Sequence, residues 1–136
     1  MNRINVLVVE DDQDLREAIT ETLEVAGFTV AGVDRGENAL KWLEQAQCDL
    51  VISDVNMPGI DGYELMHQIA SNWPHLPVLI MTAYGSISNA VEAIRNGAVD
   101  YLEKPFSTEA LTNIVRQYVA DSTDMEEPVA EDPETI

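Results

Sequence analysis

The chain has 136 residues, of which 25 are acidic and seven are basic, so its formal net charge is -18. Such an acidic excess argues against binding to nucleic acid or to an anionic membrane, and favours cations or basic protein surfaces as partners. The length suits a single domain with one core. The single Cys48 leaves no internal disulfide, and no apolar run approaches the ~20 residues of a membrane span. The first residues lack a charged segment followed by an apolar one, so we expect no signal peptide. We therefore expect a cytoplasmic protein.

The acidic residues are distributed unevenly along the chain. Residues 121–136 contain seven acids, two prolines and no base, and they lack the apolar periodicity of a packed segment. We therefore expect residues 1–120 to form the domain. We expect residues 121–136 to be an acidic tail or interdomain linker, either disordered or extending the last helix.

Five apolar runs rich in Val and Ile alternate with five segments of helical periodicity. The expected strands cover residues 4–9, 28–33, 49–53, 77–81 and 98–102. Asp14 and Glu17 form a D-x-x-E start for the first helix, which Gly27 ends, whereas Asp61 and Ser107 are the expected N-caps of the third and fifth helices. This alternation requires crossover connections. The expected fold is α/β, a doubly wound five-stranded parallel sheet of order 2-1-3-4-5, as in flavodoxin.

Ligands of such sheets bind at the carboxyl ends of the strands, where this chain concentrates acidic residues. Glu10, Asp11 and Asp12 follow the first strand, and Asp54 and Asn56 follow the third. Because the first and third strands are neighbours in this order, Asp11, Asp12 and Asp54 should converge. Carboxylate oxygens suit Mg²⁺, for which Mn²⁺ can substitute, and the backbone carbonyl of Asn56 can face the same ion. The sequence predicts a magnesium site that offsets this repulsion.

Two further side chains at the same edge indicate phosphoryl chemistry. Thr82 follows the fourth strand and Lys104 follows the fifth. An aspartate can attack phosphorus, and the acyl phosphate that forms carries charge on three oxygens. A metal ion, an ammonium group and a hydroxyl can each stabilise one of them. Asp54 is thus the expected phosphoryl acceptor, and a cis bond before Pro105 would aim Lys104 inward.

Four motifs in the expected order resemble the receiver domain of two-component response regulators. They are "VVEDD", "SDVNMPGIDGYEL", "TAYGS" and "DYLEKPF". The stretch "TAYGSISNAVEAIRNGAVDYLEKPF" is most similar to receivers of NtrC-like, sigma-54-dependent enhancer-binding activators. The resemblance implies that a sensor histidine kinase transfers a phosphoryl group to Asp54. It implies a signalling switch rather than a conventional enzyme, although a receiver catalyses its own phosphorylation and dephosphorylation.

The resemblance also implies how the state of Asp54 is transmitted. Thr82 and Tyr101 match the switch residues of receivers, and Asn56 and Tyr84 match positions that set the lifetime of the acyl phosphate. The 86–120 face would contact an effector or a second copy in a phosphorylation-dependent homodimer. We expect a C-terminal effector domain with ATPase and DNA-binding functions that controls transcription, which would make this chain a fragment. A stand-alone regulator is the alternative.

Three other functions fit parts of this pattern. A flavodoxin has the same architecture, but its first loop is rich in Ser, Thr and Gly rather than in carboxylates. A magnesium-dependent phosphatase of the haloacid dehalogenase type also uses an aspartate nucleophile, but has a second acid where this chain has Asn56. A pseudo-receiver that only binds proteins would not need the full set of Asp11, Asp12, Asp54, Thr82 and Lys104. Glu10 has no assigned role.

Overall fold

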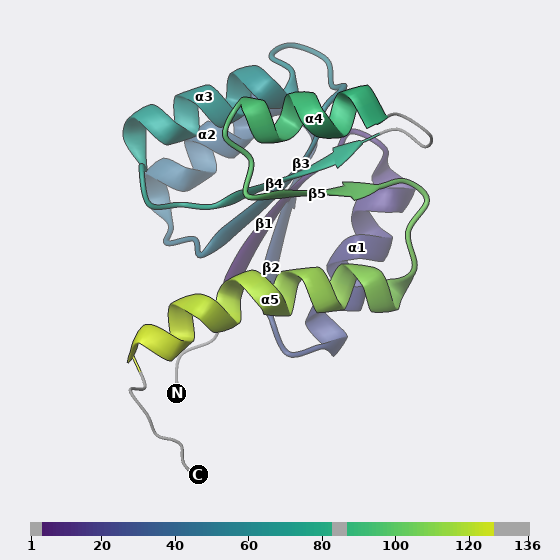
Figure 1. The fold of residues 1–136 in the computed structure, drawn as a ribbon, viewed down its shortest axis with the longest axis vertical. Coiled ribbons are helices and arrows are strands. Elements are labelled where there is room, and N and C mark those ends of the chain that lie inside the picture. Colours follow the sequence, from purple (N-terminus) through teal and green to yellow (C-terminus); the bar gives the residue numbers. More distant parts are fainter. Residues whose placement is uncertain (1–3, 83–86, 127–136) are drawn as a thin grey trace, which may run out of the picture.

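The computed structural model describes residues 4–82 and 87–126, except for the side chains of 87–89 and 120–126. Five strands alternate with five helices, as the sequence predicts (Figure 1). The strands are β1 (Asn5–Val9), β2 (Thr29–Val33), β3 (Leu50–Asp54), β4 (Val78–Thr82) and β5 (Asp100–Glu103). The helices are α1 (Gln13–Val25), α2 (Gly36–Gln45), α3 (Gly62–Asn72), α4 (Ile87–Arg95) and α5 (Thr108–Glu126).

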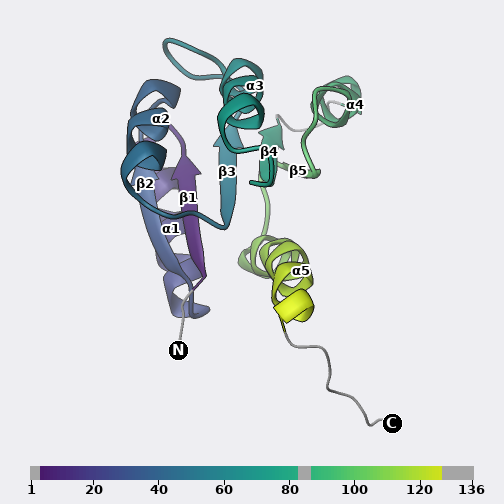
Figure 2. The same cartoon turned by 90° about the vertical axis from the view of Figure 1, so that its left-hand side faces the viewer.

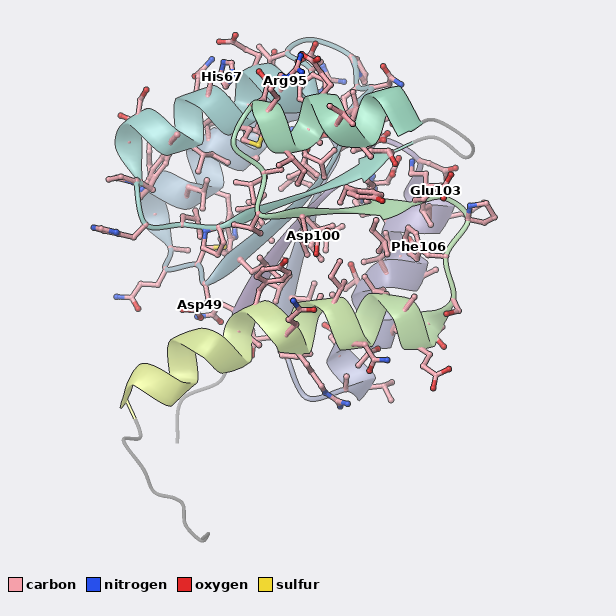
Figure 3. All side chains as sticks on the ribbon, in the orientation of Figure 1. Asp49, His67, Arg95, Asp100, Glu103 and Phe106 are labelled. Atoms are coloured by element: carbon pink, nitrogen blue, oxygen red, sulfur yellow. The ribbon has the colours of Figure 1, made fainter. Side chains whose placement is uncertain are left out.

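The strands form one parallel sheet in the order β2-β1-β3-β4-β5, which confirms the predicted topology. Figure 2 shows this order across the sheet. Because all strands run the same way, their carboxyl ends meet at a single edge. Glu103 and Phe106 lie at that edge, whereas Asp49 lies at the opposite one (Figure 3).

Helices cover both faces of the sheet, with α1 and α5 on one face and α2, α3 and α4 on the other (Figure 1). Alternate residues of each buried strand therefore point into two separate cores. In β1, Val6 and Val8 pack with α1 and α5, whereas Leu7 and Val9 pack with α2 and α3. This burial on both faces explains why the central strands are continuously apolar.

The N-cap of α1 differs from the prediction. The first helix begins at Gln13, and the carboxylate of Asp12 caps it by accepting a hydrogen bond from the Leu15 N–H at 3.2 Å. Asp14 lies within the first turn, where it interacts favourably with the helix dipole. The predicted caps Asp61 and Ser107 are confirmed, because each side chain accepts the backbone N–H three residues later.

Two predicted loop residues are the last residues of strands. Asp54 pairs with Met81 across β3 and β4, and Thr82 pairs with Glu103 across β4 and β5. The carbonyl of Asp54 also lies against Gly62, the first residue of α3, where a Cβ atom would overlap it. Asp54 and Thr82 are thus held by the regular backbone of the sheet rather than by flexible loops.

The last helix continues beyond the predicted domain boundary. Helix α5 runs to Glu126, so residues 121–126 extend the last helix, and residues 127–136 lie outside the described part of the chain. No helix among the described residues is both long and apolar enough to cross a membrane.

Candidate functional site

Three carboxylates meet at the carboxyl edge of the sheet. Glu10 and Asp11 follow β1, and Asp54 ends the neighbouring strand β3. Each offers a ligand oxygen, and these oxygens all lie within 4.8 Å of one another. Glu10 and Asp54 are buried, whereas Asp11 is exposed. The group therefore has a closed inner side and one side that is open to solvent.

The side chain of Lys104 bridges two of these carboxylates. Its Nζ atom lies 3.0 Å from Glu10 Oε1 and 3.2 Å from Asp54 Oδ1. Lys104 follows β5, and its backbone N–H donates to the carbonyl of Thr82 at 2.9 Å. The Lys104–Pro105 bond is cis, as expected. The ammonium group thus reaches the acidic site from the far side of Asp54, three strands away from the strand that precedes Glu10 and Asp11.

Burial and neighbouring charge oppose each other at this site. Burial raises the pKa of the Asp54 carboxyl above its ordinary value, although the charge of Lys104 acts in the opposite direction. Burial likewise raises the pKa of Glu10, against hydrogen bonds from the Asp12 N–H and Lys104. Burial disfavours the charge of Lys104 too, but the hydrogen bond to Glu10 and the charge of Asp54 outweigh it and raise the pKa of Lys104. One ammonium group therefore compensates the buried carboxylates only in part.

The structure brings Glu10 rather than Asp12 into the group. Among the described residues, the carboxylate of Asp12 does not join the three clustered acids, because it caps α1. The backbone N–H of Asp12 instead donates to Glu10 Oε2 at 3.0 Å. Sequence reasoning missed Glu10, and the geometry favours it over Asp12 as the second carboxylate beside Asp11.

The hydroxyl group of Thr82 lies at the end of β4. Thr82 is 1% exposed, and its Oγ1 atom has no hydrogen-bond partner among the residues that the structure describes. Thr82 is one residue beyond Met81, which pairs with Asp54 on the adjacent strand. A buried hydroxyl without a partner costs about 1–3 kcal/mol. Such a group is suited to a ligand that binds next to Asp54.

The remaining predicted residues lie around this edge. Asn56 is exposed in the connection between β3 and α3. Tyr101 lies on β5 with 39% of its surface exposed, beside a shallow hollow lined by Ala90, Val91, Ile94 and Arg95 of α4. Tyr84 lies outside the described residues. The sheet therefore brings together Asp11, Asp54, Thr82 and Lys104, with Tyr101 on the neighbouring surface.

Comparison with known proteins identifies the family. Residues 6–116 match the model of the response regulator receiver domain. The chain belongs to the response regulator receiver family. It is therefore a receiver domain of the two-component type, as its motifs predict.

Among curated proteins, the receiver domain is similar to response regulators and to DNA-binding transcriptional regulators. It is 53% identical over 113 residues to the response regulator protein FleR of Pseudomonas aeruginosa, covering 83% of this chain and 24% of that protein. It is 37% identical over 128 residues to the DNA-binding transcriptional regulator NtrC of Escherichia coli, covering 94% of this chain and 27% of that protein. The chain thus spans about a quarter of the length of these relatives, and the NtrC-like character of its sequence is confirmed.

Solved structures show the same fold. A putative response regulator from Chloroflexus aurantiacus superposes with a TM-score of 0.84 at 36% identity, covering 88% of this chain and 99% of that one. NtrX from Brucella abortus superposes with a TM-score of 0.86 at 30% identity, covering 92% of this chain and 29% of that one. The receiver fold is therefore matched both by a receiver of similar length and within a longer regulator.

Replacing Thr82 with valine should stabilise the resting fold. The variant Thr82→Val removes a buried hydroxyl that has no hydrogen-bond partner in residues 4–82 and 87–126, so the free energy of unfolding in urea should rise by about 1 kcal/mol. The control is Thr20→Val, because the hydroxyl of Thr20 donates to the Arg16 carbonyl at 2.8 Å. Thr20→Val should lower the free energy of unfolding, because it removes a hydrogen bond. If Thr82→Val lowers the free energy of unfolding as much as Thr20→Val does, or more, the prediction is wrong.

The charge of Asp54 should oppose folding at neutral pH when divalent cations are chelated. Because burial raises its folded-state pKa, the native state binds the Asp54 proton more tightly than the unfolded state does, and stability is lost as the pH rises through the folded pKa. Asp54→Asn should therefore raise the midpoint of urea unfolding at pH 7, and this gain should vanish below about pH 4.

An exposed aspartate supplies a control of opposite sign. A hydrogen bond from Asn38 lowers the pKa of Asp34, so its charge favours folding above the unfolded pKa and this contribution is lost as the pH falls. Asp34→Asn should slightly lower the midpoint at pH 7. A lower midpoint for Asp54→Asn at pH 7 would overturn the assignment of Asp54 as a destabilising charge.

Proposed function

We propose that this receiver domain is a phosphorylation-activated switch that accepts a phosphoryl group from a sensor histidine kinase on Asp54. The observation that carries the proposal is the placement of Lys104 Nζ 3.2 Å from Asp54 Oδ1. On the adjacent strand lies the buried Thr82 hydroxyl, for which the described part of the chain offers no hydrogen-bond partner. A phosphoryl group bound to Asp54 would lie near two donors, the ammonium group of Lys104 and the hydroxyl group of Thr82. Asp54 is buried but keeps 8% of its surface accessible on the side that is open to solvent, where a phosphodonor would approach.

The carboxylates fit a magnesium ion. Glu10, Asp11 and Asp54 offer hard oxygen atoms within 4.8 Å of one another, which is the donor chemistry that Mg²⁺ prefers. The backbone carbonyl of Asn56 is the further ligand predicted from the sequence, and Mn²⁺ can substitute. When bound, the ion supplies positive charge that offsets the carboxylates and an incoming phosphoryl oxygen.

The transfer itself follows from the roles of the chain's own residues. A lone pair on an Asp54 oxygen forms the new bond to phosphorus while the bond from phosphorus to the kinase imidazole breaks, and the imidazole keeps that electron pair. Lys104 and Thr82 then hold separate oxygens of the acyl phosphate. Asn56 and Tyr84 set how easily water reaches the acyl phosphate and therefore its lifetime.

The α4–β5 surface transmits the phosphorylated state. A hydrogen bond from the Thr82 hydroxyl to a phosphoryl oxygen on Asp54 favours an inward position of that hydroxyl. The side chain of Tyr101 then turns towards the space that the Thr82 hydroxyl leaves. Val91 and Ile94 of α4, 49% and 47% exposed, flank Tyr101 and form an apolar surface for a second copy. A longer chain would carry the effector domain that controls transcription, since the match covers only 27% of NtrC, which is named as a DNA-binding transcriptional regulator.

Phosphorylation can be tested directly by intact mass. Incubation with acetyl phosphate and Mg²⁺ should add about 80 Da, and EDTA or Asp54→Ala should abolish the addition. Asp34→Ala removes an exposed aspartate and should retain it. The absence of an adduct under all conditions would favour a pseudo-receiver and refute the proposal. Continuous release of phosphate with many turnovers would indicate an aspartyl-phosphate phosphatase instead.

The apolar surface can be tested by sedimentation. Adding beryllofluoride, a phosphoryl mimic, with Mg²⁺ should increase the mass of the wild type to that of a dimer, and Val91→Glu with Ile94→Glu should prevent this. Val25→Glu is the matched control, because Val25 is 88% exposed on the distant helix α1. The Val25→Glu variant should still dimerise. An unchanged wild-type mass would reject a homodimer in favour of contact with an effector domain.

A further inference from the structure

Arg16 on α1 reaches back to the acidic loop at the end of β1. Its Nη1 atom donates to the carbonyl oxygen of Glu10 at 2.8 Å, and the residue is half-buried. No role follows for this residue from its charge alone, because a guanidinium group beside clustered carboxylates would repel a divalent cation. The hydrogen bond from Arg16 to the Glu10 carbonyl must therefore act by fixing the position of the backbone at the end of β1.

The contact with Arg16 completes the fixation of Glu10. The Glu10 N–H donates to the Val33 carbonyl at 3.0 Å, which extends the β1–β2 pairing by one residue. Its carboxylate accepts from the Lys104 ammonium group and from the Asp12 N–H, each at 3.0 Å. With the carbonyl bound by Arg16, both backbone polar groups and both carboxylate oxygens of Glu10 have partners. Glu10 is 1% exposed, so each of these partners replaces water.

The orientation of the Glu10 carbonyl determines where Asp11 lies. The carbonyl of one residue and the N and Cα atoms of the next share a rigid peptide plane. A donor that fixes the Glu10 carbonyl therefore also fixes the Cα atom of Asp11, from which an exposed carboxylate points to the same group as Asp54. Arg16 thus acts on the one carboxylate of the group that burial does not hold in place.

The neighbouring strand leaves room for the Arg16 side chain. A Cβ atom at Gly32 of β2 would lie 3.2 Å from Arg16 Cγ and 3.3 Å from Cδ, closer than ordinary van der Waals contact. Glycine at this position allows the stem of Arg16 to lie across β2. The stem of Arg16 therefore passes beside β2, and its guanidinium group points towards the Glu10 carbonyl.

We propose that Arg16 is a positioning residue for the metal and phosphoryl site, acting through the Glu10–Asp11 peptide plane. The proposal rests on the proposed function of the same site. It implies that Arg16 improves Mg²⁺ binding through geometry although its positive charge opposes it. Geometry and charge therefore predict opposite effects when Arg16 is replaced.

The test is a Mg²⁺ titration followed by the backbone amide signals of residues near the site in nuclear magnetic resonance spectra. Arg16→Met keeps an apolar stem but removes the donor and the charge, and should weaken Mg²⁺ binding about tenfold, as expected for the loss of a residue that orients a metal ligand. Arg16→Lys keeps the positive charge but replaces the guanidinium group with an ammonium group, whose donors are arranged differently. Its affinity for Mg²⁺ should lie between those of Arg16→Met and the wild type.

Arg35→Met is the matched control for charge. Arg35 precedes α2 at the same edge of the sheet, and its ion pair with the exposed Asp34 is 3.7 Å long. This variant should bind Mg²⁺ like the wild type or slightly more tightly. Unchanged binding by Arg16→Met would overturn the positioning role, and tighter binding would overturn it and show that the charge of Arg16 dominates.

The two proposals fail in different ways. If the wild type neither binds Mg²⁺ nor gains mass from acetyl phosphate, the proposed function fails. If the wild type does both and Arg16→Met matches Arg35→Met, only the role of Arg16 fails. In the phosphorylation reaction, Arg16→Met should raise the Mg²⁺ concentration for half-maximal rate about tenfold and largely recover its rate at saturating Mg²⁺. Should Arg16→Met not fold, Arg16→Lys decides: wild-type affinity in that variant refutes the proposal.

Discussion

The acidic edge of the sheet depends on one ammonium group. Parallel strands bring Glu10, Asp11 and Asp54 together, and Lys104 is the cation that contacts two of the three in the described structure. Three carboxylates face one ammonium group, so their combined charge exceeds what Lys104 balances. Burial raises the pKa of both Glu10 and Asp54 in spite of the contact with Lys104. Such an imbalance costs stability in the resting state, but it also provides the attraction for a divalent cation. In the proposed function, the charge that destabilises the resting fold would thus be the charge that attracts the metal ion.

Most of the architecture could be predicted because the signals were local and periodic. Alternating apolar strands and amphipathic helices determine a doubly wound sheet, and the order of the strands then brings Asp54 and Lys104 to the same edge. The ends of elements were less predictable. Asp54 and Thr82 belong to strands because the ladder pairs them with Met81 and Glu103, and this pairing depends on neighbouring strands rather than on the residues themselves.

The presence of Glu10, and not of the predicted Asp12, in the acidic group has a clear physical origin. In a run of three acids, the pair that faces the site depends on where the strand ends and the helix begins. The helix begins at Gln13, so Asp12 is required as its cap and turns towards the Leu15 N–H. Glu10 continues the β1–β2 pairing through Val33 and turns its carboxylate towards Lys104. The spacing of three residues between Asp12 and the first apolar helical residue, Leu15, was the available signal for this cap.

The structure also connects the site to surfaces outside it through β5. The Thr82 carbonyl accepts the Lys104 N–H, so the residue with the unpartnered hydroxyl and the residue with the bridging ammonium group are joined through their backbones. Three residues before Lys104, Tyr101 faces the apolar hollow against α4, and the preceding Asp100 accepts a 2.7 Å hydrogen bond from the Tyr118 hydroxyl of α5. A ligand that engaged Thr82 and Lys104 together would therefore act on a strand that contacts α4 and that is hydrogen-bonded to α5 through Asp100. Strand β5 is thus hydrogen-bonded directly to α5, the helix that continues to Glu126.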